Sequence, residues 1–187
     1  MKTAEVTTKT KWVIDRAHSE ISFKVKHLMI TNVKGVFKEF DASIYTTNDD
    51  SILTDIDFHM KAGSVDTGDE KRDAHLRSAD FFNVEKNEKI TFSSTPCVNL
   101  DKDAVFEAEG DLTMNGITRK IKLDVEFGGI MKDPWGNLKA GFAITGKINR
   151  KNWGLNWNAA LEAGGMLVSD EVRISCDVQL VKQAFQS

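Results

Sequence analysis

The chain is poor in the residue types that cross-link a backbone or interrupt its strands. It has two cysteines and two prolines among 187 residues. Two cysteines cannot build a disulfide scaffold, and Cys97 and Cys176 lack the C-x-x-C spacing of a thiolate metal site. We expect both to be buried free thiols. Because proline removes a backbone donor from a sheet, a chain with only Pro96 and Pro134 can form long uninterrupted strands.

The chain also lacks long apolar segments and a strong charge of one sign. No stretch approaches the roughly 20 apolar residues of a membrane-spanning helix. Residues 1–11 lack the apolar core of a secretory signal, so we expect a flexible N-terminal segment and a cytoplasmic protein. A periplasmic location is the alternative if a signal peptide has been removed. The net charge of −3 argues against a nucleic-acid partner, because binding phosphates requires a basic face.

The chain does contain a persistent alternation of apolar and polar residues. Ile21, Phe23 and Val25 alternate with polar neighbours, and residues 121–127 and 172–180 repeat the pattern. Period two is typical of strands with one buried face and one wet face. The pattern predicts eight long strands near 20–30, 33–45, 52–63, 89–99, 104–114, 117–129, 138–149 and 171–182, with a short lead-in strand at 12–15. Such a chain must close on itself or stack into a sandwich.

Short connections favour antiparallel neighbours in up-and-down order within one domain, residues 12–187. Asn115-Gly116 is the clearest turn, because both central residues of a type I′ hairpin need positive φ. One segment departs from the strand pattern. Thr67 and Glu70 have the spacing of a capping box and predict a short helix at Gly68–Ala79. The helix would cap one end of a barrel, and Arg77 is a candidate to hold it there.

The apolar side of the strands is rich in phenylalanine, which outnumbers tyrosine 11 to 1. Phenylalanine has no polar group, so these residues form either a packed core or the wall of a cavity for an apolar ligand. The candidates for such a wall are Phe23, Val25, Phe58, Met60, Phe92, Phe106, Leu123, Phe127, Phe142, Ile144 and Trp153.

Two polar residues are candidates for contacts near a cavity mouth. His27 shares the apolar side of its strand, where it is either a core histidine held by a hydrogen bond or a contact to a ligand head group. Arg150 precedes a segment with two tryptophans, Trp153 and Trp157. It either pairs with a carboxylate beside a plug of packed indoles or holds an anionic head group with Lys151.

Catalytic and metal-binding patterns are weak. Asp15, His18 and Ser19 are the residue types of a hydrolase triad, but they fall within five residues and no G-x-S-x-G motif occurs. A turn whose side chains hold the backbone is the simpler interpretation. His59 shares the wet face of its strand, and His75 with Asp73 would be a poor chelate on a helix. We therefore predict no metal and no cofactor.

At these residues the chain resembles the YceI-like family of polyisoprenoid- and lipid-binding domains. The resemblance runs from Trp12 to Lys182. Its main anchors are Trp12–Asp15, His18–Phe23, Arg72–Phe82, Gly110–Arg119 and Trp153–Leu155. It implies an all-β, lipocalin-like, eight-stranded antiparallel barrel with a helix at one end. The resemblance also implies an elongated apolar cavity and often a homodimer. It further implies a bacterial protein, and many members of the family are exported.

The function predicted from the sequence is that of a non-catalytic binding or carrier protein for a polyisoprenoid or related lipid. Three alternatives stay open. The ligand can be a fatty acid, an amide or another amphiphile. The protein can be a structural or stress-associated dimer whose barrel is filled by its own side chains. It can also be an enzyme acting on a lipid, with His27 or His75 as general acid or base.

Overall fold

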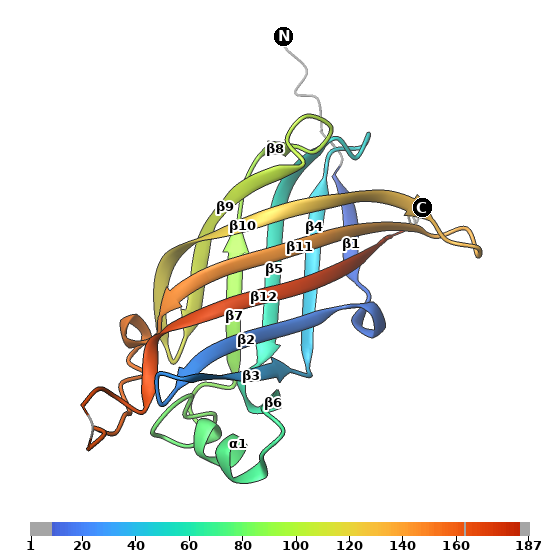
Figure 1. The fold of residues 1–187 in the computed structure, drawn as a ribbon. Coiled ribbons are helices and arrows are strands. Elements are labelled where there is room, and N and C mark those ends of the chain that lie inside the picture. Colours follow the sequence, from blue (N-terminus) through green and yellow to red (C-terminus); the bar gives the residue numbers. More distant parts are fainter. Residues whose placement is uncertain (1–8, 163, 184–187) are drawn as a thin grey trace.

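The computed structural model describes residues 9–162 and 164–183 (Figure 1). Twelve strands and one α-helix account for most of them. The strands are β1 (Thr10–Ile14), β2 (Glu20–His27), β3 (Thr31–Phe37), β4 (Phe40–Thr46), β5 (Ile52–Lys61), β6 (Val65–Asp66), β7 (Lys89–Ser94), β8 (Val98–Asn99), β9 (Val105–Met114), β10 (Ile117–Lys132), β11 (Leu138–Asn149) and β12 (Val168–Lys182). The helix is α1 (Glu70–Arg77), and short 3-10 turns occupy η1 (Arg16–His18), η2 (Ala62–Ser64) and η3 (Arg150–Trp153).

The strands close into the predicted eight-stranded antiparallel barrel. The ring runs β1, β4, β5, β7, β9, β10, β11 and β12, and Ile14 opposite Leu180 joins β12 back to β1. β1 and β2 both pair with β12, so they are two parts of one barrel strand. β4 pairs with β1 and β3 pairs with β2, so β3 and β4 are likewise two parts of the next strand. The lead-in strand at 12–15 is therefore the first half of the first barrel strand. Most of the segment predicted as flexible lies outside the described residues, but Thr10 and Lys11 belong to β1.

Polar side chains of Asp15 and Ser19 explain why the first barrel strand is interrupted at η1. The Asp15 carboxylate accepts a hydrogen bond from the Ala17 backbone at 3.2 Å and caps the turn. The Ser19 hydroxyl donates to the Gln179 carbonyl, and the Gln179 amide donates back to Ser19 Oγ at 2.9 Å. These bonds hold both halves of the strand against β12. The triad-like residues thus fix a turn, as the simpler interpretation of the sequence expects.

Helix α1 covers one end of the barrel, beside the β2–β3 hairpin (Figure 1). The capping box predicted at Thr67 is wrong. Asp69 is the N-cap and accepts from the Arg72 amide at 3.0 Å, while the Thr67 hydroxyl donates to buried Asp73 at 2.6 Å. The helix begins two residues later than predicted because that bond holds Thr67 outside it. Arg77 Nε donates to the Gly63 carbonyl at 3.2 Å, which ties the helix to the barrel end as expected.

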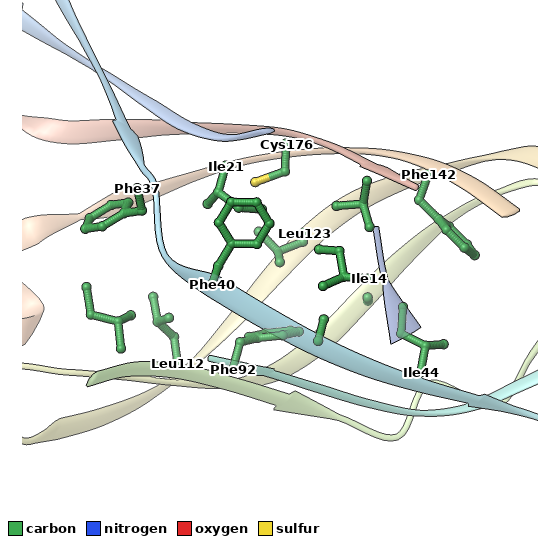
Figure 2. Close-up of a cluster of buried hydrophobic side chains, with 14 of the residues drawn as sticks. Ile14, Ile21, Phe37, Phe40, Ile44, Phe92, Leu112, Leu123, Phe142 and Cys176 are labelled. Carbon is green, nitrogen blue, oxygen red and sulfur yellow. The ribbon is translucent and has the colours of Figure 1, made fainter. Parts of the chain in front are cut away.

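The inward faces of the strands make one apolar interior. Figure 2 shows Ile21 and Cys176 pointing inward from β2 and β12, with Leu112 and Phe92 facing them from β9 and β7. Both cysteines are free, as predicted. The expectation that both are buried is wrong for Cys97, which lies exposed in the connection between β7 and β8, where strand alternation no longer applies. Among the described residues, no helix has the length and apolar character needed to cross a bilayer.

Candidate functional site

The barrel encloses a cavity of about 560 Å³. This volume lies within the range of about 300–1,000 Å³ that is usual for small-molecule sites. The wall is formed by inward-facing side chains of strands on all sides of the ring, together with residues of α1 and of the 155–168 segment. Most of these side chains are apolar. The interior can therefore accommodate an elongated apolar molecule but offers few hydrogen bonds to hold a polar one.

Nine of the eleven apolar residues predicted for the wall are placed there. They are Phe23, Val25, Phe58, Met60, Phe92, Phe106, Leu123, Phe142 and Ile144. They come from six different strands and meet because each occupies the inward position of its strand. Whether they contact a ligand stays a prediction.

Glycines opposite the large side chains make room for them. A Cβ built on Gly35 would lie 2.3 Å from Phe23 Cζ, and one built on Gly110 would lie 2.6 Å from Phe92 Cζ. Real Cβ atoms essentially never come that close to another heavy atom. These two rings therefore occupy space beside glycine positions of neighbouring strands that a larger residue would fill.

Phe127 lies outside the main cavity, contrary to the prediction. Phe127, on β10, packs instead on Phe142 with ring centroids 5.1 Å apart. It borders a separate void of about 10 Å³ beside Trp12 and Leu180. Strand alternation gives the face of a residue correctly and says nothing about its depth along the barrel.

Trp153 is also absent from the cavity wall. It is the last residue of η3 and is fully buried, and its indole Nε1 donates to the Leu112 carbonyl at 3.0 Å. The Asn115 side chain donates to the Trp153 carbonyl at 2.9 Å and fixes the segment to the β9–β10 turn. Trp153 therefore belongs to a packed plug at the barrel end, which was the alternative left open for this segment.

The mouth of the cavity is at the α1 end. Most lining residues are buried or half-buried, whereas Lys26, Asp69, Lys71 and Arg72 are exposed and so mark where the cavity meets solvent. His27 lines the same opening from the end of β2 and is half-buried. The structure thus places His27 at a mouth, as predicted, in a predominantly cationic rim.

Arg150 is the most unusual polar residue of the wall, because only 3% of it is exposed. Its Nε donates to the Ser169 carbonyl at 2.9 Å, and Nη1 donates to the carbonyls of Leu155 and Trp157. Burial lowers the pKa of Arg150, and Asp170, 3.9 Å from Nη2, partly offsets the effect. Nη2 is buried without a hydrogen-bond acceptor among the described residues. A buried donor of this kind favours an acceptor supplied by a ligand.

Three aromatic rings at the mouth were not predicted to act together. The His75 ring packs edge-on against Phe81 and Trp157, at centroid distances of 5.0 and 4.6 Å, and Phe81 contacts Trp157 at 5.4 Å. His75 Nε2 and Asp80 Oδ2 are 2.8 Å apart, so the imidazole is oriented by a carboxylate. The ring contacts join α1 to the 155–168 segment, and all three residues line the cavity.

No pattern in the sequence could have joined these rings, because α1 and Trp157 are about 80 residues apart in irregular segments. Arg150, by contrast, continues the inward alternation of Phe142, Ile144 and Ile148, which was a usable indication of its burial. Among the described residues, no group of three or more histidine, cysteine or acidic side chains is placed to hold a metal ion. The wall therefore offers apolar contact, one buried guanidinium and a cationic rim.

Comparisons with known proteins place the chain in a family. The model of the YceI-like domain matches residues 12–180. A UPF0312 protein of Staphylococcus epidermidis is 40% identical over 171 residues, which are 91% of this chain and 96% of that protein. A crystal structure of the Campylobacter jejuni YceI protein is 31% identical, with a TM-score of 0.71 over 91% of this chain and 97% of that one.

A more distant neighbour shares the fold. A polyisoprenoid binding domain from Saccharophagus degradans is 14% identical, has a TM-score of 0.69 and covers 92% of this chain and 98% of its own. The closed antiparallel barrel, the single helix and the ordered motifs from Trp12 onward agree with the family match. The chain belongs to the YceI-like domain family.

Proposed function

We propose that this protein binds an elongated apolar lipid in its barrel, a polyisoprenoid or a related chain, and carries it without chemical change. The observation that carries the proposal is the open apolar cavity of about 560 Å³. A barrel filled by its own side chains, one of the alternatives from the sequence, does not fit a volume of this size. The description of the Saccharophagus degradans domain as polyisoprenoid binding supports the same class of ligand.

The free energy available from such a cavity is similar in size to the cost of association. Burying apolar chain contributes about 0.8 kcal/mol per CH₂. Two isoprene units, about ten carbons, would contribute about 8 kcal/mol, which is comparable to the association cost of about 4–15 kcal/mol. A chain that fills the barrel would therefore bind without many polar contacts. This matches a wall with few polar groups.

One observation favours an amphiphile over a pure hydrocarbon. Arg150 lines the cavity, and its Nη2 is a buried donor with no acceptor among the described residues. A phosphate, carboxylate or carbonyl oxygen on the ligand would satisfy it. The polyprenyl lipid and the fatty-acid or amide alternative both carry such an oxygen, so the chemistry of the tail decides between them.

The direct test is native mass spectrometry of protein purified without detergent, followed by organic extraction. A co-purifying mass that extracts as a polyprenyl species would support the proposal. A co-purifying fatty acid or amide would support the alternative ligand class. A protein that carries no ligand and takes up neither class when offered would contradict it. Recovery of the offered lipid in altered chemical form would instead indicate an enzyme, and His75→Asn and His27→Asn would then show which imidazole acts.

A matched pair of variants tests whether the cavity is the binding site. Phe106 lines the cavity, whereas its neighbour Val105 on β9 is 74% exposed on the outer face. Phe106→Asp is expected to abolish lipid uptake while the protein stays folded, because the carboxylate enters an open cavity. Val105→Asp introduces the same charge one residue away and is expected to leave uptake unchanged. Equal uptake by both variants would place the lipid elsewhere.

The homodimer implied by the family resemblance and the cytoplasmic location are two further proposals about the same protein. Light scattering on the purified protein tests the dimer, and a mass of one chain, 20.9 kDa, would contradict it. Fractionation of the native cells tests the location. Neither proposal is needed for the lipid-binding proposal.

A further inference from the structure

An apolar tip projects beside the mouth of the cavity. It consists of Leu28, Met29 and Ile30 in the β2–β3 turn and Met166 in the segment before β12, all exposed. Ile30 is 79% exposed. A Cβ built on Gly165 would lie 3.9 Å from Met29 Cγ, so the Met29 side chain lies against the segment that carries Met166. Side chains of this size gathered at one place indicate an interaction surface more often than scattered ones do.

The turn holds these residues in an unfavourable backbone conformation. Leu28 has φ 54° and Met29 has φ 62°, both in the left-handed region. The β9–β10 turn at the same end has positive φ at Asn115 and Gly116, which are the residues that such a hairpin favours. Placing Leu and Met there costs free energy in the backbone and leaves their side chains in water. A function of the tip would account for both costs.

The tip and the cavity mouth are continuous. The Leu28 amide donates to the Leu167 carbonyl at 2.9 Å, which joins the turn to the segment before β12. Lys26, His27, Leu167 and Val168, which flank the tip on both sides, line the cavity. Figure 1 shows the β2–β3 turn and the start of β12 side by side at the end where α1 lies. A surface bound by the tip would therefore lie directly at the entrance of the barrel.

A row of cations lies on the outer face of the strands that lead to the tip. Lys34 of β3, Lys24 of β2, Arg173 of β12 and Lys147 of β11 are directly opposite one another in consecutive strands, and all four are exposed. Like charges in directly opposite positions destabilise a sheet. Glu20 and Glu171 lie near Lys34 and Arg173, at 3.2 and 3.3 Å, so the row is only partly compensated.

The outer face of β9 and β10 has the opposite arrangement. There Lys120 faces Asp111 and Lys122 faces Glu109 across the two strands. Lys120 is 3.7 Å from Asp111, and Lys122 is 2.9 Å from Glu107. The cationic row is thus a local feature of the strands beside the mouth, in a chain whose net charge is −3. It is complementary to an anionic surface.

We propose that the mouth end of the barrel docks on an anionic lipid bilayer. The apolar tip enters the boundary between head groups and acyl chains, and Lys24, Lys26, Lys34 and Arg173 face the lipid phosphates. Interfacial binding of this kind combines buried apolar area with attraction to anionic lipid. A second copy of the chain is a poorer occupant, because a symmetric contact of two tips would bring two cationic rows together. Docking depends on this surface and does not require that the lipid-binding proposal be correct.

The test is flotation with vesicles of phosphatidylcholine alone and of phosphatidylcholine mixed with phosphatidylglycerol. The protein is expected to float with the anionic vesicles and to dissociate as salt is raised, because salt screens surface charge. Lys24→Gln with Lys26→Gln is expected to weaken this binding by about tenfold or more, since each cation near the surface contributes about 1 kcal/mol. Failure to bind anionic vesicles, or equal binding to both kinds, would overturn the proposal.

The apolar tip is tested with a variant that removes its side chains and suits the backbone conformation of the turn. Leu28→Asn with Met29→Gly and Ile30→Thr gives the turn the residues its backbone prefers, and is expected to reduce vesicle binding about tenfold or more without lowering the melting temperature. Met131→Thr with Trp135→Ser removes apolar side chains that are 75% and 85% exposed from the β10–β11 hairpin at the far end and is expected to bind as wild type. If the tip variant binds vesicles like the wild type, the proposal is overturned. It is also overturned if the variant changes the oligomeric state of the protein and leaves vesicle binding unchanged.

Discussion

The two ends of the barrel differ in how their side chains meet. At the end away from α1, Trp12 and Leu180 are each 1% exposed and border a void of only about 10 Å³. At the α1 end, the rings of His75, Phe81 and Trp157 contact one another over an open cavity. One strand pattern thus produces a closed core at one end and an open container at the other. Stability and ligand binding are separated along the axis of the barrel.

The largest effect is expected from removing a tryptophan at the closed end. Trp12 is fully buried, and its indole donates to Thr46 Oγ1 at 3.0 Å. Trp12→Ala is expected to lower the free energy of unfolding by about 3–5 kcal/mol, because the packed neighbours cannot fill the space. Trp157→Ala at the open end, where the indole already borders a cavity, is expected to cost about 1 kcal/mol or less. Urea denaturation measures both, and equal losses would show that the two ends are packed alike.

The middle of the barrel can be changed by a single methyl group. Gly35→Ala places a Cβ 2.3 Å from Phe23 Cζ, so the ring must move, and we expect it to move into the cavity that it lines. We expect a loss of about 1–3 kcal/mol in the free energy of unfolding, as for an overpacked core. The same displacement shortens the space available to a lipid, so uptake of long chains is expected to fall more than uptake of short ones.

Gly63→Ala is the matched control for this substitution. Gly63 has open space where its Cβ would be built, and its carbonyl would still accept from Arg77. Stability and lipid uptake are expected to stay within error of the wild type. A Gly35→Ala protein that behaves like this control would show that Phe23 can move without entering the cavity.

These comparisons also show what the sequence could and could not predict. The alternation of apolar residues predicted the eight-stranded antiparallel ring and the face of most side chains, because period two is a property of the extended backbone itself. It gave no depth, so Phe127 was assigned to the cavity although it packs at the closed end. It does not apply in irregular segments, so the plug around Trp153 and the ring contacts of His75 with Trp157 required the tertiary structure.

The helix shows a similar limit at a smaller scale. Both Thr67 and Asp69 are common N-cap residues, and their sequence spacing favoured Thr67. The choice between them depends on Asp73, whose buried carboxylate accepts from the Thr67 hydroxyl and from the Thr67 amide. That partner is visible only when the turn before the helix is known. Local patterns therefore predicted the existence of α1 and missed its first residue.

The junction between the two halves of the first barrel strand is expected to weaken in acid. Burial opposes ionisation of Asp15, but hydrogen bonds from Lys139, His18 and Gln179 outweigh it and lower the pKa of Asp15 to about 2. A carboxyl with a lowered pKa stabilises the folded state above its unfolded value, near 4, and loses that contribution as the pH falls towards 2. The contribution is on the order of 2 kcal/mol.

Thermal unfolding between pH 5 and pH 2 measures this contribution. Asp15→Asn removes the titrating group and is expected to flatten the part of the pH dependence that lies between about 4 and 2. The variant is also less stable than wild type at neutral pH, because Lys139 loses its carboxylate partner. An unchanged slope in the variant would mean that other carboxyl groups are responsible for acid sensitivity.

The smallest expected effect is a difference in the reactivity of two thiols, one outside the barrel and one inside. Cys97 is exposed, whereas Cys176 is buried and lines the cavity. Burial raises the pKa of Cys176 to about 11, so its reactive thiolate is a small fraction at neutral pH. We expect an alkylating reagent to modify Cys97 first and Cys176 much more slowly, with the slow rate rising about tenfold per pH unit between 7 and 9.

The slow reaction also reports on the open end. In a Cys97→Ser protein stripped of lipid, a small apolar reagent can reach Cys176 through the mouth, and a bound chain would occupy the same path. We therefore expect added lipid to slow the labelling of Cys176, and Trp157→Ala to speed it in the empty protein because the indole lines the cavity. Mass spectrometry of the labelled protein measures both rates. A labelling rate that changes neither with lipid nor with Trp157→Ala would mean that the reagent reaches Cys176 when the sheet opens. The cavity would then not connect Cys176 to the mouth beside α1.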